Sequence, residues 1–376
     1  MQTKHDIKTM RAAQGVDYGD VDKVMTVEDG VPYWSLKDLP KKKRKGFMIV
    51  KTHAVALACG DCRVLSGLTR ELQGPPSFPY VPCGDCSGVV VEIPSEEDNK
   101  DFPFKVGDRV TAFFHEYPRN ALAEYALVHM DVCEIIPESV SSVDAAALAS
   151  ASPAVLLADR IQAGERVLVL GAGGGVGSHL VQLMRKRGAS FIAGVSRAPK
   201  RLLEPPLSYD RAVDYTKEDV FAMDEFKDNQ FDVILDLASG GWTSLQKDYS
   251  SGIKKSIIKP GSMGGRYLTI TPDNAIFELH SIPAALKLFM LIPLWRYTKS
   301  RLWGRSRLPK YSFAISMPDK REVMTRTMQL AEEGSLKAVI DPKGPFPFTT
   351  EGVRNAFKLQ ESRHIQGKVI VETAKN

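Results

Sequence analysis

The sequence predicts an α/β protein in which a doubly wound parallel sheet is inserted into a β-rich domain. Residues 1–150 hold short β-branched and aromatic runs separated by Gly and Pro clusters, whereas the chain from residue 166 onward alternates strands and helices. The last part of the chain is predicted to form two helices and a strand, which are expected to pair with the first domain. A length of 376 residues suits two domains, at ~100–200 residues for each.

The β-rich part is predicted from four runs and from the turn KVGD at 105–108, which suits a compact barrel-like unit. The expected strands are Met48–Ala58, Cys86–Ile93, Arg109–Phe114 and Ala123–His129. The closing elements are expected as a helix over 319–333, a helix near 350–360 and a strand over Lys368–Val371. This pattern places the β-rich domain at 1–150 and 318–376, and the inserted domain at 151–317.

The pattern changes near residue 145, where the Ala-rich helical stretch Ala145–Ala158 begins. The apolar run Arg166–Leu170 that follows is typical of a strand buried on both faces of a parallel sheet. The elements expected after it are a helix over 176–187 and the strands Phe191–Val195, Phe231–Leu237 and Tyr267–Ile270.

The composition of the chain argues against several classes of protein. At 43% hydrophobic and 25% charged residues the chain is average for a globular protein, and a net charge of +5 spread over both halves does not argue for nucleic acid binding. An odd count of five cysteines argues against a disulfide framework, which favours a reducing compartment, cytoplasmic or organellar. We expect no transmembrane helix, because no run of 18 apolar residues exists.

The central motif is VLVLGAGGGVGSHLVQL at 167–183, a strand followed by a glycine turn and an amphipathic helix. The dinucleotide fingerprint G-x-G-x-x-G fits it in the register Ala172, Gly174, Gly177. Gly174 would let the backbone approach a pyrophosphate, Gly177 would let helix and strand pack closely, and the helix start with Gly175 and Val176 would face the phosphates. The alternative is a tight turn with no ligand. The motif therefore predicts a Rossmann domain that binds a dinucleotide.

The end of the second strand predicts which dinucleotide. NAD sites place an acid there, ~20 residues past the fingerprint, to hold the ribose 2′-hydroxyl. This sequence has Ser196 and Arg197 instead, followed by Lys200 and Arg201. Because Arg and Ser can bind a 2′-phosphate that a carboxylate would repel, NADPH is predicted over NADH. The alternative for Lys200 and Arg201 is a solvated position on a helix.

At this point the chain resembles a known family over nearly its whole length: the zinc-independent quinone oxidoreductases of the medium-chain dehydrogenase/reductase superfamily. The motifs that carry the resemblance are VKTHAVALACGD (50–61), VPCGDCSGVVVE (81–92), KVGDRV (105–110), AEY (123–125), AGERVLVLGAGGGVG (163–177), VDYTKED (213–219), FDVILD (231–236) and GKVIV (367–371). The C-terminal third is most similar to the reticulon-4-interacting, mitochondrial-type quinone reductases. The resemblance implies a GroES-like catalytic domain built from both chain ends, and it matches Ser196, Arg197 and Tyr215 to positions that hold the 2′-phosphate.

The same resemblance has a consequence for the binding of a catalytic zinc. Alcohol dehydrogenases of the superfamily bind a catalytic zinc through a Cys and a His, and these positions hold Ala58 and Gly84 here. We therefore expect no catalytic zinc. Two C-x-x-C pairs, Cys59–Cys62 and Cys83–Cys86, have a spacing close to that of a four-Cys zinc site. They are interpreted as small apolar filler, with a metal or disulfide site as the alternative.

The predicted function is transfer of a hydride from NADPH to a quinone or another α,β-unsaturated carbonyl, without zinc. The alternatives are an enoyl-thioester or alkenal reductase, and a non-catalytic NADPH-binding subunit of a membrane-associated assembly. No proton donor is evident, and Asp61, Arg63 and Tyr117 are weak candidates, with a structural turn as the alternative for Asp61. Family members often carry Asn at the position of Ala58 and Thr at that of Pro153, and this chain has neither.

Two further segments raise questions about partners. The run KKKRK at 41–45 is interpreted as a solvated turn rather than a nuclear or nucleic-acid signal. Residues 275–310 combine a strongly apolar stretch with a basic tail, the pattern of a peripheral membrane helix. A substrate lid or a homodimer contact is the alternative for this segment.

Overall fold

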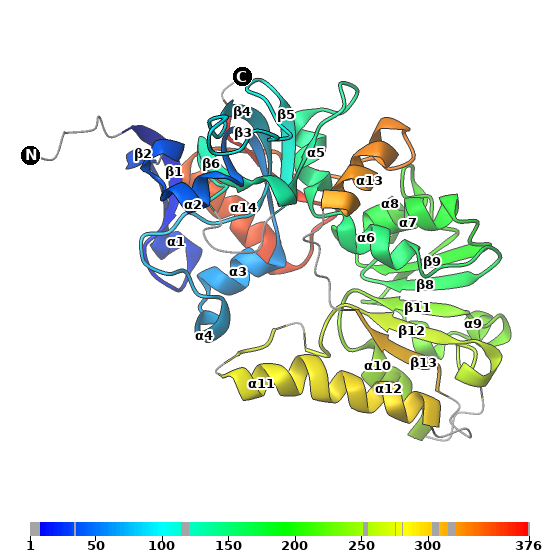
Figure 1. Cartoon of the computed structure of the whole chain (residues 1–376). Coiled ribbons are helices and arrows are strands. Elements are labelled where there is room, and N and C mark those ends of the chain that lie inside the picture. Colours follow the sequence, from blue (N-terminus) through cyan, green and yellow to red (C-terminus); the bar gives the residue numbers. More distant parts are fainter. Residues whose placement is uncertain are drawn as a thin grey trace, which may run out of the picture. The chain divides into compact units, whose positions relative to one another are not determined.

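A computed structural model describes residues 8–33, 35–113, 120–250, 255–274, 276–279, 281–302, 308–314 and 321–374 of the chain (Figure 1). The chain divides into two compact units. The split unit contains Met1–Ser152 and Pro318–Asn376, and the inserted unit contains Pro153–Met317.

The split unit is built on a sheet that is antiparallel except at one edge. Its order is β14-β15-β3-β4-β5-β7, with β6 paired to β3. The strands are β3 (Phe47–Leu57), β4 (Asp85–Glu92), β5 (Arg109–Phe113), β6 (Tyr125–His129), β7 (Cys133–Ile135), β14 (Phe346–Pro347) and β15 (Val369–Glu372). β15 pairs with β3 through Val369 and Leu57, so the C-terminal strand completes a sheet begun by the N-terminal half.

Helices and a second, two-stranded sheet complete the split unit. The two strands are β1 (Thr9–Gly15) and β2 (Met25–Pro32), which the sequence patterns did not indicate. The helices are α1 (Val21–Val24), α2 (Lys41–Arg44), α3 (Cys59–Leu65), α4 (Arg70–Gln73), α5 (Ser142–Ala149), α13 (Arg321–Glu332) and α14 (Thr350–Ser362). Phe357 and Val353 of α14 join Leu57 of β3 in the main hydrophobic core. The basic run at 41–45 forms the short α2, whose three lysines are exposed.

The helical stretch expected over Ala145–Ala158 is two helices. α5 ends at Ala149, and α6 (Ser152–Ala158) begins with Pro153 in its first turn. Proline lacks the N–H that a continuous helix would need and is tolerated at a helix start. This proline therefore explains the break at the junction of the two units.

The inserted unit is a six-stranded parallel sheet in the order β10-β9-β8-β11-β12-β13. The strands are β8 (Arg166–Leu170), β9 (Phe191–Ser196), β10 (Arg211–Asp214), β11 (Val233–Asp236), β12 (Arg266–Thr269) and β13 (Lys310–Phe313). Counted along the chain this is 3-2-1-4-5-6, the strand order of a Rossmann domain. The order reverses between β8 and β11, which makes that place the expected ligand-binding crevice.

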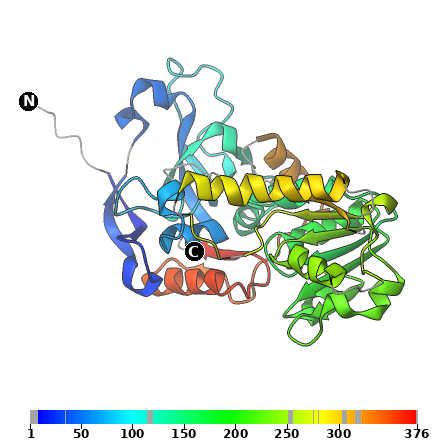
Figure 2. The same cartoon turned by 90° about the horizontal axis from the view of Figure 1, so that it is seen from below.

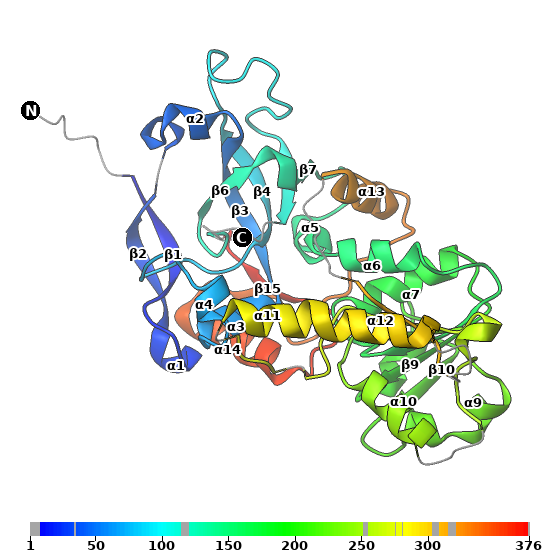
Figure 3. The ribbon, with the colours of Figure 1, turned by 60° about the horizontal axis from the view of Figure 1, so that its bottom comes forward.

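Helices cover both faces of this sheet, with α7 (Gly177–Lys186) on one side and α10 (Gly241–Ser250) on the other (Figures 1 and 3). The remaining helices are α8 (Pro199–Leu203), α9 (Asp224–Asp228), α11 (Ile282–Leu286) and α12 (Ile292–Leu302). Val167, Leu168 and Val169 of β8 have no exposed surface, as a strand covered on both faces requires.

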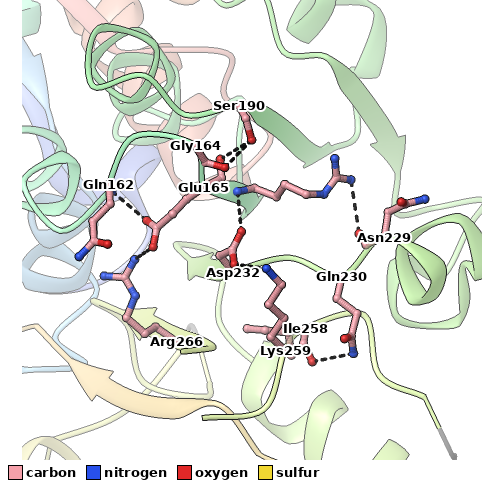
Figure 4. Close-up of polar contacts among 11 residues, drawn as sticks. Gln162, Gly164, Glu165, Ser190, Asn229, Gln230, Asp232, Ile258, Lys259 and Arg266 are labelled. Carbon is pink, nitrogen blue, oxygen red and sulfur yellow. Dashed lines mark hydrogen bonds and ion pairs between the residues drawn. The ribbon is translucent and has the colours of Figure 1, made fainter. Parts of the chain in front are cut away.

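A network of charged side chains lies at the edge of this sheet where the strands begin (Figure 4). Asp232 accepts a hydrogen bond from the Arg166 backbone N–H at 2.9 Å and pairs with the Lys259 Nζ at 2.5 Å. Glu165 accepts from the Gln162 N–H at 2.8 Å and pairs with Arg266. Partial burial raises the pKa of Asp232. The hydrogen bonds and charges of Arg166 and Lys259 together lower it by more, so the net shift is downward. These contacts tie β8, β11 and β12 together at the end opposite the candidate site.

Candidate cofactor and active site

The glycine turn after β8 is shaped by close backbone contacts. Gly171 has a φ of +81°, a conformation that favours glycine. A Cβ at Gly177 would lie 2.6 Å from the carbonyl oxygens of Gly171 and Ala172, so a larger residue would push α7 away from the turn. A Cβ at Gly174 would meet nothing nearer than the Gly171 carbonyl oxygen at 3.6 Å. The surface at Gly174 is therefore open to the approach of a ligand.

Helix α7 begins directly after this turn without a capping side chain. Its N-cap, Val176, makes no side-chain hydrogen bond to the first turn, and the Ser178 N–H already donates to the Gly174 carbonyl at 3.0 Å. The first turn of a helix presents N–H groups and the positive end of the helix dipole. Together with Gly175 just before it, this uncapped start fits a phosphate.

Ser196, at the end of β9, lies beside the glycine turn. A Cβ on Gly173 would lie 2.9 Å from the Ser196 hydroxyl oxygen, which accepts a hydrogen bond from the Ala198 N–H at 3.2 Å. The next residue, Arg197, is exposed, as is Lys200 in α8. The Ser196 hydroxyl is thus next to the turn at the carboxyl edge of the sheet, and Arg197 and Lys200 follow it in the chain.

Tyr215 reaches the same edge from the neighbouring strand. Asp214 pairs in register with Ser196, so Tyr215 and Arg197 leave adjacent strand ends, and Tyr215 is 52% exposed. The register also brings an acid to this edge that the sequence analysis missed. The Asp214 carboxylate accepts hydrogen bonds from the Thr216 hydroxyl at 2.7 Å and N–H at 3.1 Å, and these bonds lower its pKa. Lys217, 3.3 Å away, offsets its charge.

A second carboxylate organises the edge at the point where the strand order reverses. Asp236 ends β11 and accepts hydrogen bonds from the N–H groups of Ala238, Ser239 and Gly241 at 2.9–3.0 Å, and from the Tyr267 hydroxyl. Ala238 lies close to Gly171, because a Cβ added at Gly171 would be 3.2 Å from the Ala238 Cβ. This turn was not singled out from sequence, although an acid at the end of a buried strand was a visible signal. It lies beside the glycine turn, where the strand order reverses.

The catalytic candidates of the split unit have different surroundings. The Asp61 carboxylate accepts the Ala58 N–H at 2.8 Å and is 3% exposed, so it caps the start of α3. This contact favours the structural alternative for Asp61. Arg63 is half-buried on the same helix. Tyr117 lies outside the described residues.

None of the four cysteines of the two C-x-x-C pairs forms a disulfide, and their surroundings differ. Cys59 is exposed and accepts from the Gln360 Nε2 at 3.2 Å, while the Cys62 thiol points to the Phe357 carbonyl at 3.8 Å. Burial raises the pKa of Cys86 to about 12, and Cys83 is buried too. Within the described residues no three His, Cys, Asp or Glu side chains are grouped so as to hold a metal ion. The absence of zinc stays a prediction.

A buried ion pair lies near the two positions where zinc ligands are missing. The Lys368 Nζ is 3.3 Å from the Asp85 Oδ2 and 2.6 Å from the Ser150 hydroxyl, and Lys368 and Asp85 are 7% and 3% exposed. Asp85 follows Gly84, and Lys368 precedes the residue that pairs with Leu57. No pattern in the sequence predicts this pair.

Comparison with known proteins defines the class. Residues 44–138 match the alcohol dehydrogenase GroES-like domain, and residues 207–371 match the zinc-binding dehydrogenase family. The NADPH-dependent alkenal/one oxidoreductase of Arabidopsis thaliana chloroplasts is 29% identical, covering 97% of this chain and 80% of that protein. The mitochondrial NAD(P)H oxidoreductase RTN4IP1 of Mus musculus is 26% identical, covering 86% and 81%.

The fold of the whole chain has the same likeness. The Escherichia coli quinone oxidoreductase, solved as a complex with NADPH, superposes with a TM-score of 0.68 at 18% identity, covering 96% of this chain and 99% of that one. These matches confirm the expected fold class, a Rossmann sheet with a GroES-like domain. The family models and these relatives show that the chain is similar to dehydrogenases and reductases of the medium-chain dehydrogenase/reductase type, among them quinone and alkenal oxidoreductases.

Proposed function

We propose that this protein is an NADPH-dependent reductase of quinones or other α,β-unsaturated carbonyls. The observation that carries the proposal is the carboxyl edge of the inserted unit, where an open glycine turn and an uncapped helix start adjoin Ser196 and Arg197. The names of the Arabidopsis, mouse and Escherichia coli relatives, two of which specify NADPH, support it.

The described residues fit NADPH. Its pyrophosphate would lie on the turn from Ala172 to Gly177, where Gly174 leaves room for it. Its 2′-phosphate would be held by four side chains at or after the ends of β9 and β10: Ser196, Arg197, Lys200 of α8, and Tyr215. When bound, NADPH supplies a hydride, and the protein positions the acceptor. The inserted unit is then the NADPH-binding domain and the split unit the catalytic domain.

No catalytic zinc enters the proposal. Ala58 and Gly84 offer no metal ligand at the two positions where the superfamily's alcohol dehydrogenases carry one. The acceptor is a small molecule, and no nucleic acid partner is implied. The five cysteines, none of which is in a disulfide, support a reducing compartment, cytoplasmic or organellar. Contact with a lipid surface through residues in 275–310 is a separate proposal about partners.

Alkenal and enone reduction is the second candidate. The Arabidopsis relative, whose name specifies alkenal/one substrates, matches 97% of this chain. An enoyl thioester reductase and a non-catalytic NADPH-binding subunit are the remaining alternatives, and one assay separates all of these.

The assay follows the loss of NADPH absorbance with a panel of quinones, alkenals, enones and enoyl thioesters. We expect turnover with a quinone or an enone, and no turnover with saturated ketones, which have no conjugated carbon to accept the hydride. Binding of NADPH without turnover of any acceptor would contradict the enzyme and favour the non-catalytic subunit. Turnover of enoyl thioesters alone would show that the substrates are enoyl thioesters and not quinones or enones.

A further inference from the structure

One long helix of the inserted unit carries an exposed apolar face that the proposed function does not use. α11, a π-helical turn over Lys287–Leu291 and α12 form a continuous rod from 282 to 302 (Figures 2 and 3). No helix among the described residues is long and apolar enough to cross a membrane, this one included.

One side of the rod is fixed to the inserted unit. Phe289 packs against Phe277 and Phe313, with ring centroids 5.5 and 6.3 Å apart. Farther along, Arg296 binds Asp273 with a 2.7 Å hydrogen bond, and Arg301 donates to the Tyr311 carbonyl at 2.9 Å. These contacts define which side faces the protein.

The other side presents large apolar side chains to solvent. Six of them are between 46% and 64% exposed: Ile282, Leu286, Met290, Leu291, Leu294 and Trp295. Residues four apart lie on the same face of a helix. The wider π turn inserts one extra residue, so the row of side chains that begins with 282 and 286 continues with both 290 and 291. Six exposed large side chains on one helix face form a contiguous patch of the kind that marks an interaction site.

The charged side chains of the rod itself have one sign. Residues 281–302 contain no Asp or Glu, and Glu278 is the single acid in 276–310. Among the described residues of that stretch the basic ones are Lys287, Arg296, Lys299, Arg301 and Lys310, and Arg296 is paired with Asp273. The rod therefore combines an apolar face with a basic surround.

This combination selects the occupant. A second copy using the same face would form a two-fold contact in which like charges meet, with almost no acid to compensate them. A membrane with anionic headgroups supplies both the opposite charge and an apolar layer. Exposed Trp295 and Tyr297 are side chains that favour the boundary between lipid and water.

We propose that the 282–302 rod lies in the plane of an anionic membrane surface, with its apolar face in the acyl boundary and Lys287 and Lys299 at the headgroups. The inference does not depend on the reductase activity, because vesicle binding and NADPH oxidation are separate measurements.

Co-sedimentation of the full chain with vesicles tests it, using phosphatidylcholine alone and an equal mixture with phosphatidylserine. We expect pelleting with the anionic vesicles at low salt. Pelleting should be largely lost at 1 M salt, where the screening length is about 3 Å. The substitutions Leu291→Glu and Trp295→Glu together should weaken binding at least about tenfold, since each removes an apolar side chain from the boundary.

Matched variants keep the test independent of folding. Met263→Glu places the same charge at a residue 66% exposed elsewhere on the inserted unit and should bind vesicles like the wild type. Lys287→Ala, which removes charge and leaves the apolar face intact, should weaken binding to anionic vesicles about fivefold. The thermal unfolding midpoint of each variant shows that it is folded.

Three results would overturn the proposal. The first is no pelleting of the wild type with anionic vesicles at low salt. The second is equal pelleting of the wild type and the Leu291→Glu, Trp295→Glu variant. The third is a dimer in light scattering that the same variant dissociates, without vesicle binding, which would assign the face to a second copy.

Discussion

Lys368 and Asp85, 283 positions apart in the chain, form a buried ion pair with Nζ and Oδ2 3.3 Å apart. The pair joins the C-terminal strand β15 to the start of β4, across β3. The Ser150 hydroxyl, just before the chain enters the inserted unit, gives the ammonium a second partner at 2.6 Å. The pair therefore fastens the C-terminal segment to the N-terminal part of the split unit.

Removing one member of this pair should destabilise the protein strongly. Lys368→Met leaves the Asp85 carboxylate buried without its partner, and we expect the free energy of unfolding to fall by about 3–5 kcal/mol in urea titrations. The double variant Asp85→Asn, Lys368→Met removes both charges and should recover most of the loss. Lys343→Met, at an exposed lysine of the same unit, should stay within about 0.5 kcal/mol of the wild type. A single variant as stable as the wild type would show that the pair contributes nothing.

The two glycines of the turn should respond differently to an added methyl group. Gly177→Ala places a Cβ 2.6 Å from two carbonyl oxygens and should lower the thermal unfolding midpoint and abolish NADPH binding. Gly174→Ala meets nothing nearer than 3.6 Å, so its unfolding midpoint should be unchanged, while its NADPH affinity in calorimetry should fall because the methyl group occupies the pyrophosphate's place. Wild-type affinity in Gly174→Ala would move the pyrophosphate away from this turn.

Metal analysis addresses the zinc question. Because Ala58 and Gly84 offer no ligand, purified protein should carry well under about one zinc per chain, and chelators should leave NADPH oxidation unchanged. The C-x-x-C pairs provide the opposing outcome. Stoichiometric zinc that disappears in both Cys59→Ser and Cys83→Ser would show a four-Cys site.

The sequence predicted what depends on local pattern. The strand, glycine turn and helix at 166–187 were expected almost to the residue, because buried apolar runs and a glycine turn are local signals. Ser196 was expected at the end of a strand, and it ends β9. Contacts set by strand register were missed. Asp214 reaches Ser196 through the pairing of β10 with β9, and Lys368 reaches Asp85 only once β15 has joined β3. The apolar and basic character of 275–310 was visible, but which of its residues face outward depends on the anchoring of Phe289 and Arg296.

The comparison of kcat/KM for NADPH and NADH, with one quinone or enone at a fixed concentration, tests the central claim most directly. Arg197 and Ser196 stand where an NAD enzyme has an acid, and a charge-assisted bond to the 2′-phosphate gives a preference for NADPH of at least ~10-fold. Arg197→Ala should bring the two values close together by lowering that for NADPH alone. Lys247→Ala, at an exposed lysine of α10, should keep the preference. Equal values for the two cofactors in the wild type, or a preference for NADH, would contradict the account.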